Sequence, residues 1–174
     1  MTRRALLRAH AKLLASLDLE IEHATDPTRY EASAPEVSGW SVKDHLEHLT
    51  VAHEMILSWI ERARDGDSEL DTGGTPSLLG RIVLLVGAFP RGRAKAPEPT
   101  RPQGTSAEEL VARLRGIRKR VTGLEASLTA LQTSNATRKH FAFGNLNAVQ
   151  WLRFASIHAH HHHKVIRDVL RAGD

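Results

Sequence analysis

Residues 147–171, NAVQWLRFASIHAHHHHKVIRDVLR, carry an amphipathic helical pattern with a run of histidines inside it. At about 100° per residue, its apolar side chains fall in one arc. That arc contains Ala148, Trp151, Leu152, Ala155, Val165, Ile166, Val169 and Leu170. His162 lies near its centre and His158, one turn earlier, lies inside it, whereas His160 points to the opposite face. Two imidazoles are therefore predicted to face the protein interior.

Three other long helical patterns and one short apolar pattern precede this one, separated by segments rich in proline, glycine and polar residues. The long patterns cover residues 3–24, 41–64 and 105–132, the short one covers 76–88, and the segments between include 27–39, 66–75 and 90–104. No stretch has a convincing strand pattern. Because each long helix must bury its apolar stripe against another, the sequence predicts an all-α four-helix bundle. The predicted bundle has a short extra helix and a long loop between the second and third long helices. Residues 1–174 are expected to form one domain.

The second long helix has a recognisable start. Ser41 is suited to the N-cap position, and Asp44, three residues later, is placed to reach back to the Ser41 amide as in a capping box. The helix is expected to run to about Arg64 and to stop before Gly66.

The composition excludes several classes of protein and site. The 174 residues include no cysteine, which excludes disulfides, thiolate metal ligands and a cysteine nucleophile. The N-terminal residues 1–8 lack the apolar core of a signal peptide. The most apolar segment, residues 78–89, is interrupted by Arg81 and is shorter than the roughly 20 residues that span a bilayer. A soluble, cytoplasmic protein without a membrane span is expected.

The basic charge does not indicate a nucleic-acid partner. The net charge is +4 and the sequence pI about 9.8, but the arginines are scattered along the chain. The densest run, Arg113–Arg120, contains no aromatic residue. Nucleic-acid-binding surfaces usually combine a concentrated basic face with stacking aromatics, so this run is interpreted as a solvated helix face.

The inward-facing histidines favour a metal site. An i, i+4 pair such as His158 and His162 places two imidazoles on one helix face, as in helical metalloproteases; the alternative is that both rings form hydrogen bonds in the core. On the second long helix, His45 and His53 fall inside the apolar arc and His48 at its edge. Periodicity does not choose among these three.

Three motifs resemble those of DinB/YfiT-like proteins. Residues 40–49, WSVKDHLEHL, resemble their opening motif, a Trp-Ser pair followed by a helix with histidine eight residues after the tryptophan, the place of His48. His158-x-x-x-His162 looks like their closing H-x-x-x-H motif. Residues 140–146, HFAFGNL, are similar to an H-x-x-F-G-x-L segment of one branch of the superfamily. The three motifs span most of the chain in the expected order.

The resemblance implies a DinB-like bundle in which His48, His158 and His162 bind one divalent metal ion, Zn, Ni or Fe. A three-histidine site leaves positions open for water or substrate. Two departures are visible. Val165 stands where the family often has glutamine, and the short motifs do not account for residues 76–104.

The resemblance also implies an activity, because relatives include transferases that use low-molecular-weight thiols. A metal-dependent thiol transferase acting on a small-molecule substrate is the first hypothesis, and a homodimer is implied as well. Such an enzyme needs an anion-binding patch near the metal. The candidates in the long loop are Arg91, Arg93, Lys95 and Arg101, for which ordinary linker charge is the simpler interpretation.

Two other functions are considered. A metal-dependent hydrolase needs a carboxylate as general base, and Asp44 is the nearest in sequence, although the capping box already uses it. In a non-catalytic metal-binding or partner-binding bundle, the segment Leu78–Phe89 serves as a dimer contact or a membrane-surface helix; otherwise it packs over the bundle or lines the pocket. Trp59 and Trp151 are expected in the core. His140 is a candidate for the substrate site or, equally, a surface loop residue.

Overall fold

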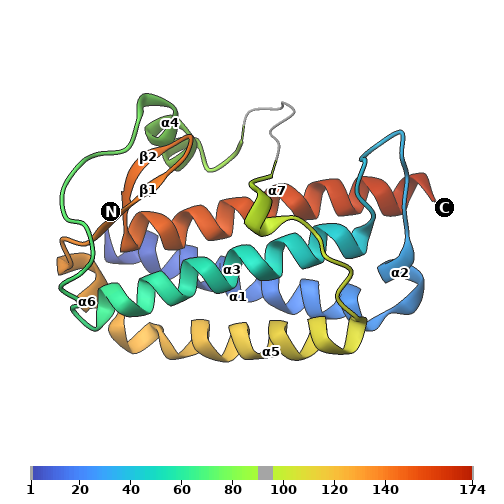
Figure 1. Ribbon diagram of the computed structural model, residues 1–174, viewed down its shortest axis with the longest axis horizontal. Helices are drawn as coiled ribbons and strands as arrows, with labels where there is room; N and C mark the ends of the chain where they lie inside the picture. Colours follow the sequence, from blue (N-terminus) through green and yellow to red (C-terminus); the bar gives the residue numbers. More distant parts are fainter. Residues whose placement is uncertain (1, 90–95, 174) are drawn as a thin grey trace.

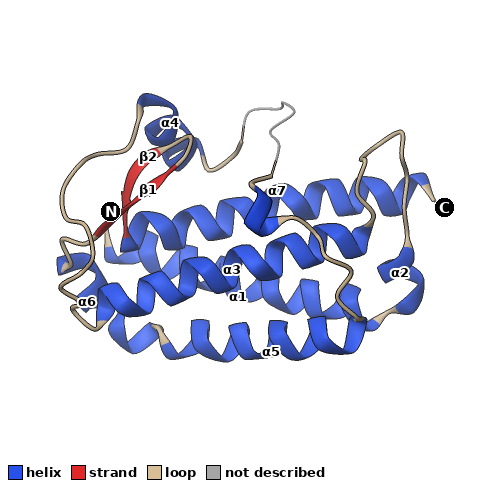
Figure 2. Cartoon of the chain, viewed as in Figure 1, coloured by secondary structure: helices blue, strands red, loops and turns tan. Residues whose placement is uncertain are grey.

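The computed structural model describes residues 2–89 and 96–173. Figures 1 and 2 show long helices lying side by side along the longest axis, with a small helix and a β-hairpin at one end. The α-helices are α1 (Arg3–Thr25), α2 (Pro27–Glu31), α3 (Val42–Arg64), α4 (Leu78–Val86), α5 (Ala107–Gly123), α6 (Leu128–Thr133) and α7 (Ala148–Ala172). The 3-10 turns are η1 (Glu98–Thr100) and η2 (Glu125–Ser127), and the strands are β1 (Thr137–His140) and β2 (Gly144–Asn147).

The core lies between α1, α3, α5 and α7. Helix α1 packs on α5 and α7, and α3 packs on the same two helices, so each long helix buries its apolar stripe between two neighbours. The largest fully buried side chains of this core are Leu6, Leu13, Leu17, Leu46, Leu49, Leu57, Ile60, Leu110, Leu114, Ile117, Leu124 and Leu131. The prediction of an all-α bundle with a short extra helix is confirmed.

Local capping fixes the helix that carries His48 where the sequence predicts. The Asp44 amide donates to Ser41 Oγ, and Asp44 Oδ2 accepts from the Ser41 amide at 2.9 Å, completing the capping box. Asn147 and Gln150 form an equivalent box at the start of α7. These reciprocal bonds satisfy amides that a helix start otherwise leaves unpaired.

The expectation of no strand is wrong, because residues 137–147 form an antiparallel hairpin with Thr137 opposite Asn147. Each strand has only four residues, too few for a clear alternation. The hairpin is stabilised by a distant segment of the chain. The Thr137 amide donates to Asp71 O at 2.7 Å, and the Ser77 amide donates to Phe143 O at 2.8 Å.

Two helix boundaries also differ from expectation. The third long helix does not continue to Gln132, because α5 ends at Gly123 and the chain turns through η2 into α6. Glycine is a poor helix former, and the turn brings Leu128 and Leu131 into the core. The segment 27–39 is not wholly a loop, since Asp26 caps the one-turn helix α2 through the amides of Thr28 and Arg29.

Arginines of α5 pair with carboxylates of neighbouring helices. Arg113 bonds Glu54 at 2.6 Å and Arg120 bonds Glu61 at 2.7 Å, both across to α3, and Arg118 bonds Asp18 on α1. The exposed pair of Arg118 and Asp18 contributes only about 0–1 kcal/mol, whereas the other two pairs are half-buried and each joins two nitrogens to two carboxylate oxygens. No helix of the described chain is long and apolar enough to cross a membrane.

Candidate metal centre

Three histidine side chains converge between α3 and α7. His48 comes from α3, and His158 and His162 come from adjacent turns of α7. The Nε2 atoms of His48 and His158 are 3.2 Å apart, and those of His158 and His162 are 3.1 Å apart. One ligand atom from each residue lies within 4.8 Å of the others, and the group can hold a metal ion.

The hydrogen bond of His48 fixes which of its nitrogens carries the proton. His48 Nδ1 lies 2.7 Å from the carbonyl oxygen of Thr100. A carbonyl only accepts, so Nδ1–H is the donor and the neutral ring has its lone pair on Nε2. That lone pair is directed at the other two histidines. A ligand histidine that donates its other N–H to a backbone carbonyl is the usual arrangement in metal sites.

A buried carboxylate next to His48 in the sequence anchors the segment that follows Thr100. Glu47 is 4% exposed, and its oxygens accept from the amides of Gln103 and Gly104 and from Thr105 Oγ1 at 2.6 Å. These bonds tie the segment after η1 to α3. Burial alone would raise the pKa of Glu47, but the hydrogen bonds outweigh it and the pKa lies below its usual value, so the carboxylate remains an acceptor.

His162 is oriented by a chain of polar contacts. Its Nδ1 lies 2.9 Å from His45 Nδ1, and His45 Nε2 lies 3.0 Å from Ser38 Oγ. If His162 Nδ1–H donates to His45, then His45 Nε2–H donates to Ser38, and His162 Nε2 presents its lone pair to the cluster. One consistent set of tautomers thus leaves two lone pairs directed at the same point.

His158 differs, because its Nδ1 is buried and has no hydrogen-bond partner among the residues that the structure describes. Its ring stacks on Phe154 with centroids 5.5 Å apart. The Nε2 atom of His158 lies within hydrogen-bonding distance of the Nε2 atoms of His48 and His162. Three Nε2 atoms therefore face one another, and three imidazole nitrogens are a donor set that suits a divalent transition metal.

The protonation state of the cluster also suits a metal. Burial lowers the pKa of His158 and His162 well below the ordinary value of 6.5, and the neighbouring imidazoles add to the effect. Burial lowers the pKa of His48 as well, against the opposing effect of the Thr100 carbonyl. Neutral imidazoles are the form that binds metal ions.

Aromatic rings flank the cluster. The Trp40 ring lies 5.1 Å from that of His48 and is stacked at 6.4 Å on that of His162. The Phe89 ring lies 6.1 Å from His158 and 5.3 Å from His161. Apolar walls of this kind limit the access of water to a metal ion and lower the local dielectric constant.

The structure separates the three candidates on α3. His48 contacts His158, His45 supports His162, and His53 turns away to contact Glu20 on α1. Asp44 remains in its capping box, as expected. Arg101 forms an ion pair with Glu98. The other loop cations, Arg91, Arg93 and Lys95, lie outside the described residues.

His140 is not a surface residue, which corrects one of the two readings of this histidine. It is 8% exposed and stacks on Phe143 with ring centroids 4.4 Å apart. Burial lowers its pKa to about 4. Trp59 and Trp151 are buried in the core as predicted.

Sequence reasoning missed the supporting residues Ser38 and Thr100, which no local signal marks. It did name the segment that ends at Phe89 as one that packs over the bundle or lines the pocket, and the Phe89 ring lies beside His158. It also missed Glu20, which is fully buried at the apolar spacing of α1. A carboxylate at that position is a detectable exception to the pattern. Glu20 Oε1 contacts His53 Nε2 at 3.4 Å and His163 Nε2 at 3.2 Å, and this second polar cluster is separate from the three convergent histidines.

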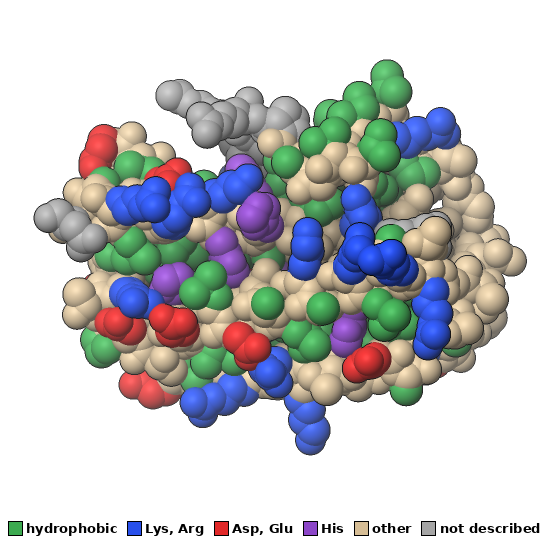
Figure 3. Space-filling model, turned by 180° about the vertical axis from the view of Figure 1, so that it is seen from behind, with side chains coloured by type: hydrophobic (Ala, Val, Ile, Leu, Met, Phe, Trp, Pro, Cys, Tyr) green, Lys and Arg blue, Asp and Glu red, His purple; other side chains and the backbone are tan. Residues whose placement is uncertain are grey.

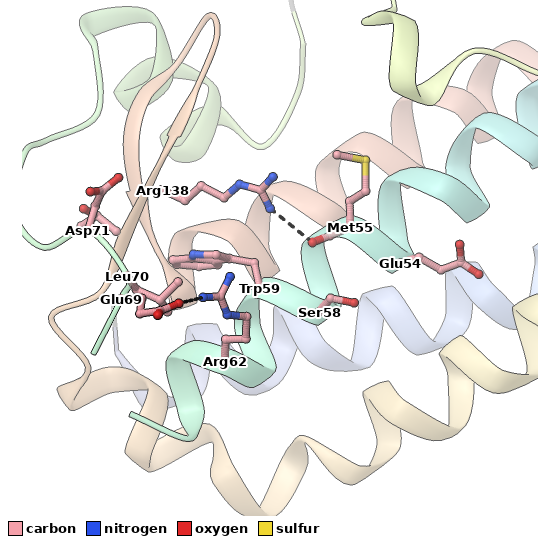
Figure 4. Close-up of a pocket in the computed structure, with 10 residues that line it drawn as sticks. Glu54, Met55, Ser58, Trp59, Arg62, Glu69, Leu70, Asp71 and Arg138 are labelled. Atoms are coloured by element: carbon pink, nitrogen blue, oxygen red, sulfur yellow. Dashed lines mark hydrogen bonds and ion pairs between the residues drawn. The ribbon is translucent and has the colours of Figure 1, made fainter. Parts of the chain in front are cut away.

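A surface pocket of about 560 Å³ lies beside α3 and β1, and none of the three convergent histidines lines it. Figure 4 shows charged side chains around it. Those of Arg62 and Glu54 already pair with Asp67 and Arg113, and Arg138 bonds the carbonyl of Met55. The pocket presents no convergent set of free polar groups.

Fold and site together define a helical-bundle protein with a histidine cluster that can hold a metal ion. The family model of the DinB superfamily matches residues 2–166, and the chain belongs to this superfamily. No curated protein and no solved structure matches the chain.

His45 is expected to act on metal binding through His162. We predict that His45→Phe weakens Zn²⁺ affinity by about 10- to 100-fold, since His162 loses the acceptor that orients it. His45→Asn keeps an acceptor oxygen near the place of Nδ1, so its Zn²⁺ affinity is expected to fall less than that of His45→Phe. The measurement is a Zn²⁺ titration against a chromophoric chelator. Equal losses in the two variants would contradict an orienting role.

Proposed function

We propose that the protein is a metal-dependent transferase that uses a low-molecular-weight thiol, with His48, His158 and His162 holding one divalent ion, Zn, Ni or Fe. The observation that carries the proposal is the convergence of three neutral imidazole nitrogens at one point. Three protein ligands leave coordination positions for a reactant, which is typical of catalytic rather than structural sites. The superfamily resemblance supports the choice of reaction and a homodimer, and the lack of cysteine fits the cytoplasmic location that we also propose.

The residues around the cluster determine which chemistry suits it. A bound divalent ion supplies a Lewis acid that favours the thiolate form of a bound thiol at neutral pH. The protein has no cysteine, so the sulfur nucleophile has to come from a second substrate. His48 and His162 are held in orientation by Thr100 and His45.

A hydrolase has less support from the site than a thiol transferase. A hydrolase needs a general base within reach of the attacking water, and the sequence candidate Asp44 bonds both Ser41 N and Ser41 Oγ with one carboxylate oxygen. Trp40 and Phe89 also place apolar surface around the histidines. These features favour a thiol nucleophile over water.

Cobalt(II) titration tests the proposal directly. The protein loaded with Co²⁺ is titrated with 2-mercaptoethanol, and the expected result is a new thiolate-to-cobalt charge-transfer absorption. Ethanol, which has the same chain length without sulfur, is the control ligand. A positive result leads to a screen of electrophilic small molecules for thiol transfer.

Two outcomes separate the parts of the proposal. A protein that binds Co²⁺ through the three histidines but shows no sulfur band would reject thiol use and retain the metal site. A protein that binds no Co²⁺ would reject both. His160→Ala, on the opposite face of α7, is expected to behave as wild type.

A further inference from the structure

Helix α4 presents its apolar face outward. Five of its nine residues have large, aliphatic and exposed side chains, namely Leu78, Leu79, Ile82, Leu85 and Val86. At 100° per residue these positions cover one continuous arc of about 120°. Leu85 is 82% exposed and Leu78 is 76% exposed. A surface helix normally faces the core with its apolar arc, so the outward orientation of α4 requires another explanation.

The orientation of α4 is fixed by contacts on its inner side. Gly80 packs against the hairpin so closely that a Cβ would lie 2.4 Å from Phe143 O. Ser77 caps the helix and donates from Oγ to Ala142 O at 3.2 Å. The guanidinium of Arg153 donates to the carbonyl of Leu84 at 2.5 Å. The helix is thus anchored at both ends, and the described residues leave its apolar arc uncovered.

The hairpin turn adds to the same surface. Phe141, between β1 and β2, is 70% exposed, and the Ser77–Ala142 bond joins this turn to the start of α4. Figure 3 shows the apolar side chains gathered on the upper part of the molecule, where Figure 1 places α4 and the hairpin. We call the five side chains of α4 and Phe141 the apolar ridge. Exposed apolar surface of this extent marks an interaction site.

The segments that carry the apolar ridge contain basic residues but no acidic ones. Residues 72–89 and 126–167, which include α4 and the hairpin, contain no aspartate or glutamate. Arg81 on α4 and Lys139 on β1 are exposed. Neither forms an ion pair within the described part of the chain. A partner that covers the ridge therefore has to supply negative charge at its edge.

We propose that the apolar ridge binds the surface of an anionic membrane, with its side chains among the lipid chains and Arg81 and Lys139 against the headgroups. Surface-lying helices that combine an apolar arc with flanking cations bind anionic bilayers in this way. Nine residues are too few to span the bilayer, so the contact is peripheral.

Charge favours a membrane over a second copy of this chain. Two copies paired through their ridges would bring Arg81 and Lys139 of each close to those of the other, and these segments supply no carboxylate to neutralise them. Like charges at an interface without counter-charge oppose association. Anionic lipid headgroups neutralise Arg81 and Lys139, so this repulsion does not arise at a membrane.

The test is flotation of the purified protein with lipid vesicles. The wild type is expected to float with vesicles of equal parts phosphatidylcholine and phosphatidylglycerol, and not with phosphatidylcholine alone. The double variant Leu85→Ser, Val86→Ser is expected to reduce partitioning by about tenfold or more, because two large aliphatic groups no longer enter the lipid. The matched control is Val37→Ser, Met55→Ser, whose side chains are 39% and 38% exposed outside the ridge.

A second pair of variants tests the charge. Arg81→Glu is expected to weaken binding severalfold, whereas Arg115→Glu, an exposed position on α5 with the same change in net charge, is expected to bind as wild type. No flotation of the wild type, or unchanged flotation of the Leu85, Val86 variant, overturns the proposal. A wild-type dimer that this variant dissociates, without vesicle binding, assigns the ridge to a second copy instead.

Discussion

Replacing His162 with alanine is expected to weaken Zn²⁺ binding by more than about 100-fold. Removal of a metal ligand is expected to weaken binding by more than the 10- to 100-fold that is lost with a residue that only orients a ligand. His162 Nε2 lies 3.1 Å from that of His158, so its loss leaves two imidazoles at the proposed site. His158→Ala and His48→Ala are expected to have equally large effects. The measurements are elemental analysis of the untagged protein and competition titration.

The matched control is His160→Ala, which removes an exposed imidazole from the same run. Thermal unfolding gives an independent measure. At Zn²⁺ about a thousandfold above Kd, the ligand stabilises the folded protein by about 4 kcal/mol. The wild type and His160→Ala should gain this stability and His162→Ala should not. If the wild type takes up neither Zn²⁺ nor Ni²⁺, the histidines are core residues and the proposed enzyme is rejected.

The long helices could be predicted from the sequence because their signals are local. The apolar spacing of α7 and the Ser41–Asp44 capping box both lie within the elements that they specify. The hairpin could not be predicted in this way, because its stabilising partners, Asp71 and Ser77, are far from it in sequence. The break after Gly123 likewise depends on whether Leu128 can reach the core.

The site was predictable to a similar extent. Periodicity on α7 predicts that His158 and His162 face inward, and the structure brings them together. On α3 it does not distinguish His45, His48 and His53, since all three are buried. Their roles differ only in which group of another element each one contacts. The resemblance of residues 40–49 to a family motif singles out His48, and periodicity does not.

Glu20→Ala is expected to destabilise the protein by about 3–5 kcal/mol, because the loss of one partner leaves buried polar groups without a counterpart. Glu20 is 0% exposed, and its Oε1 contacts the Nε2 atoms of His53 and His163. Urea unfolding of the metal-free protein measures the change. Glu22→Ala on the same helix is the control, because Glu22 is exposed and pairs only at the surface with Arg29; a change within about 0.5 kcal/mol is expected.

The pH dependence distinguishes the charge of Glu20 from its size. Burial alone would raise its pKa, but the attraction of His53 and the hydrogen bonds from His163 and His53 outweigh burial and hold it below the ordinary 4.5. The stabilising contribution of the ionised carboxylate is therefore complete above pH 4.5 and is lost as the pH falls through the lower folded value. The isosteric variant Glu20→Gln should be less stable than wild type by about 1–3 kcal/mol at neutral pH. That difference should narrow on acidification below pH 4.5, and a constant difference would show that shape rather than charge makes Glu20 necessary.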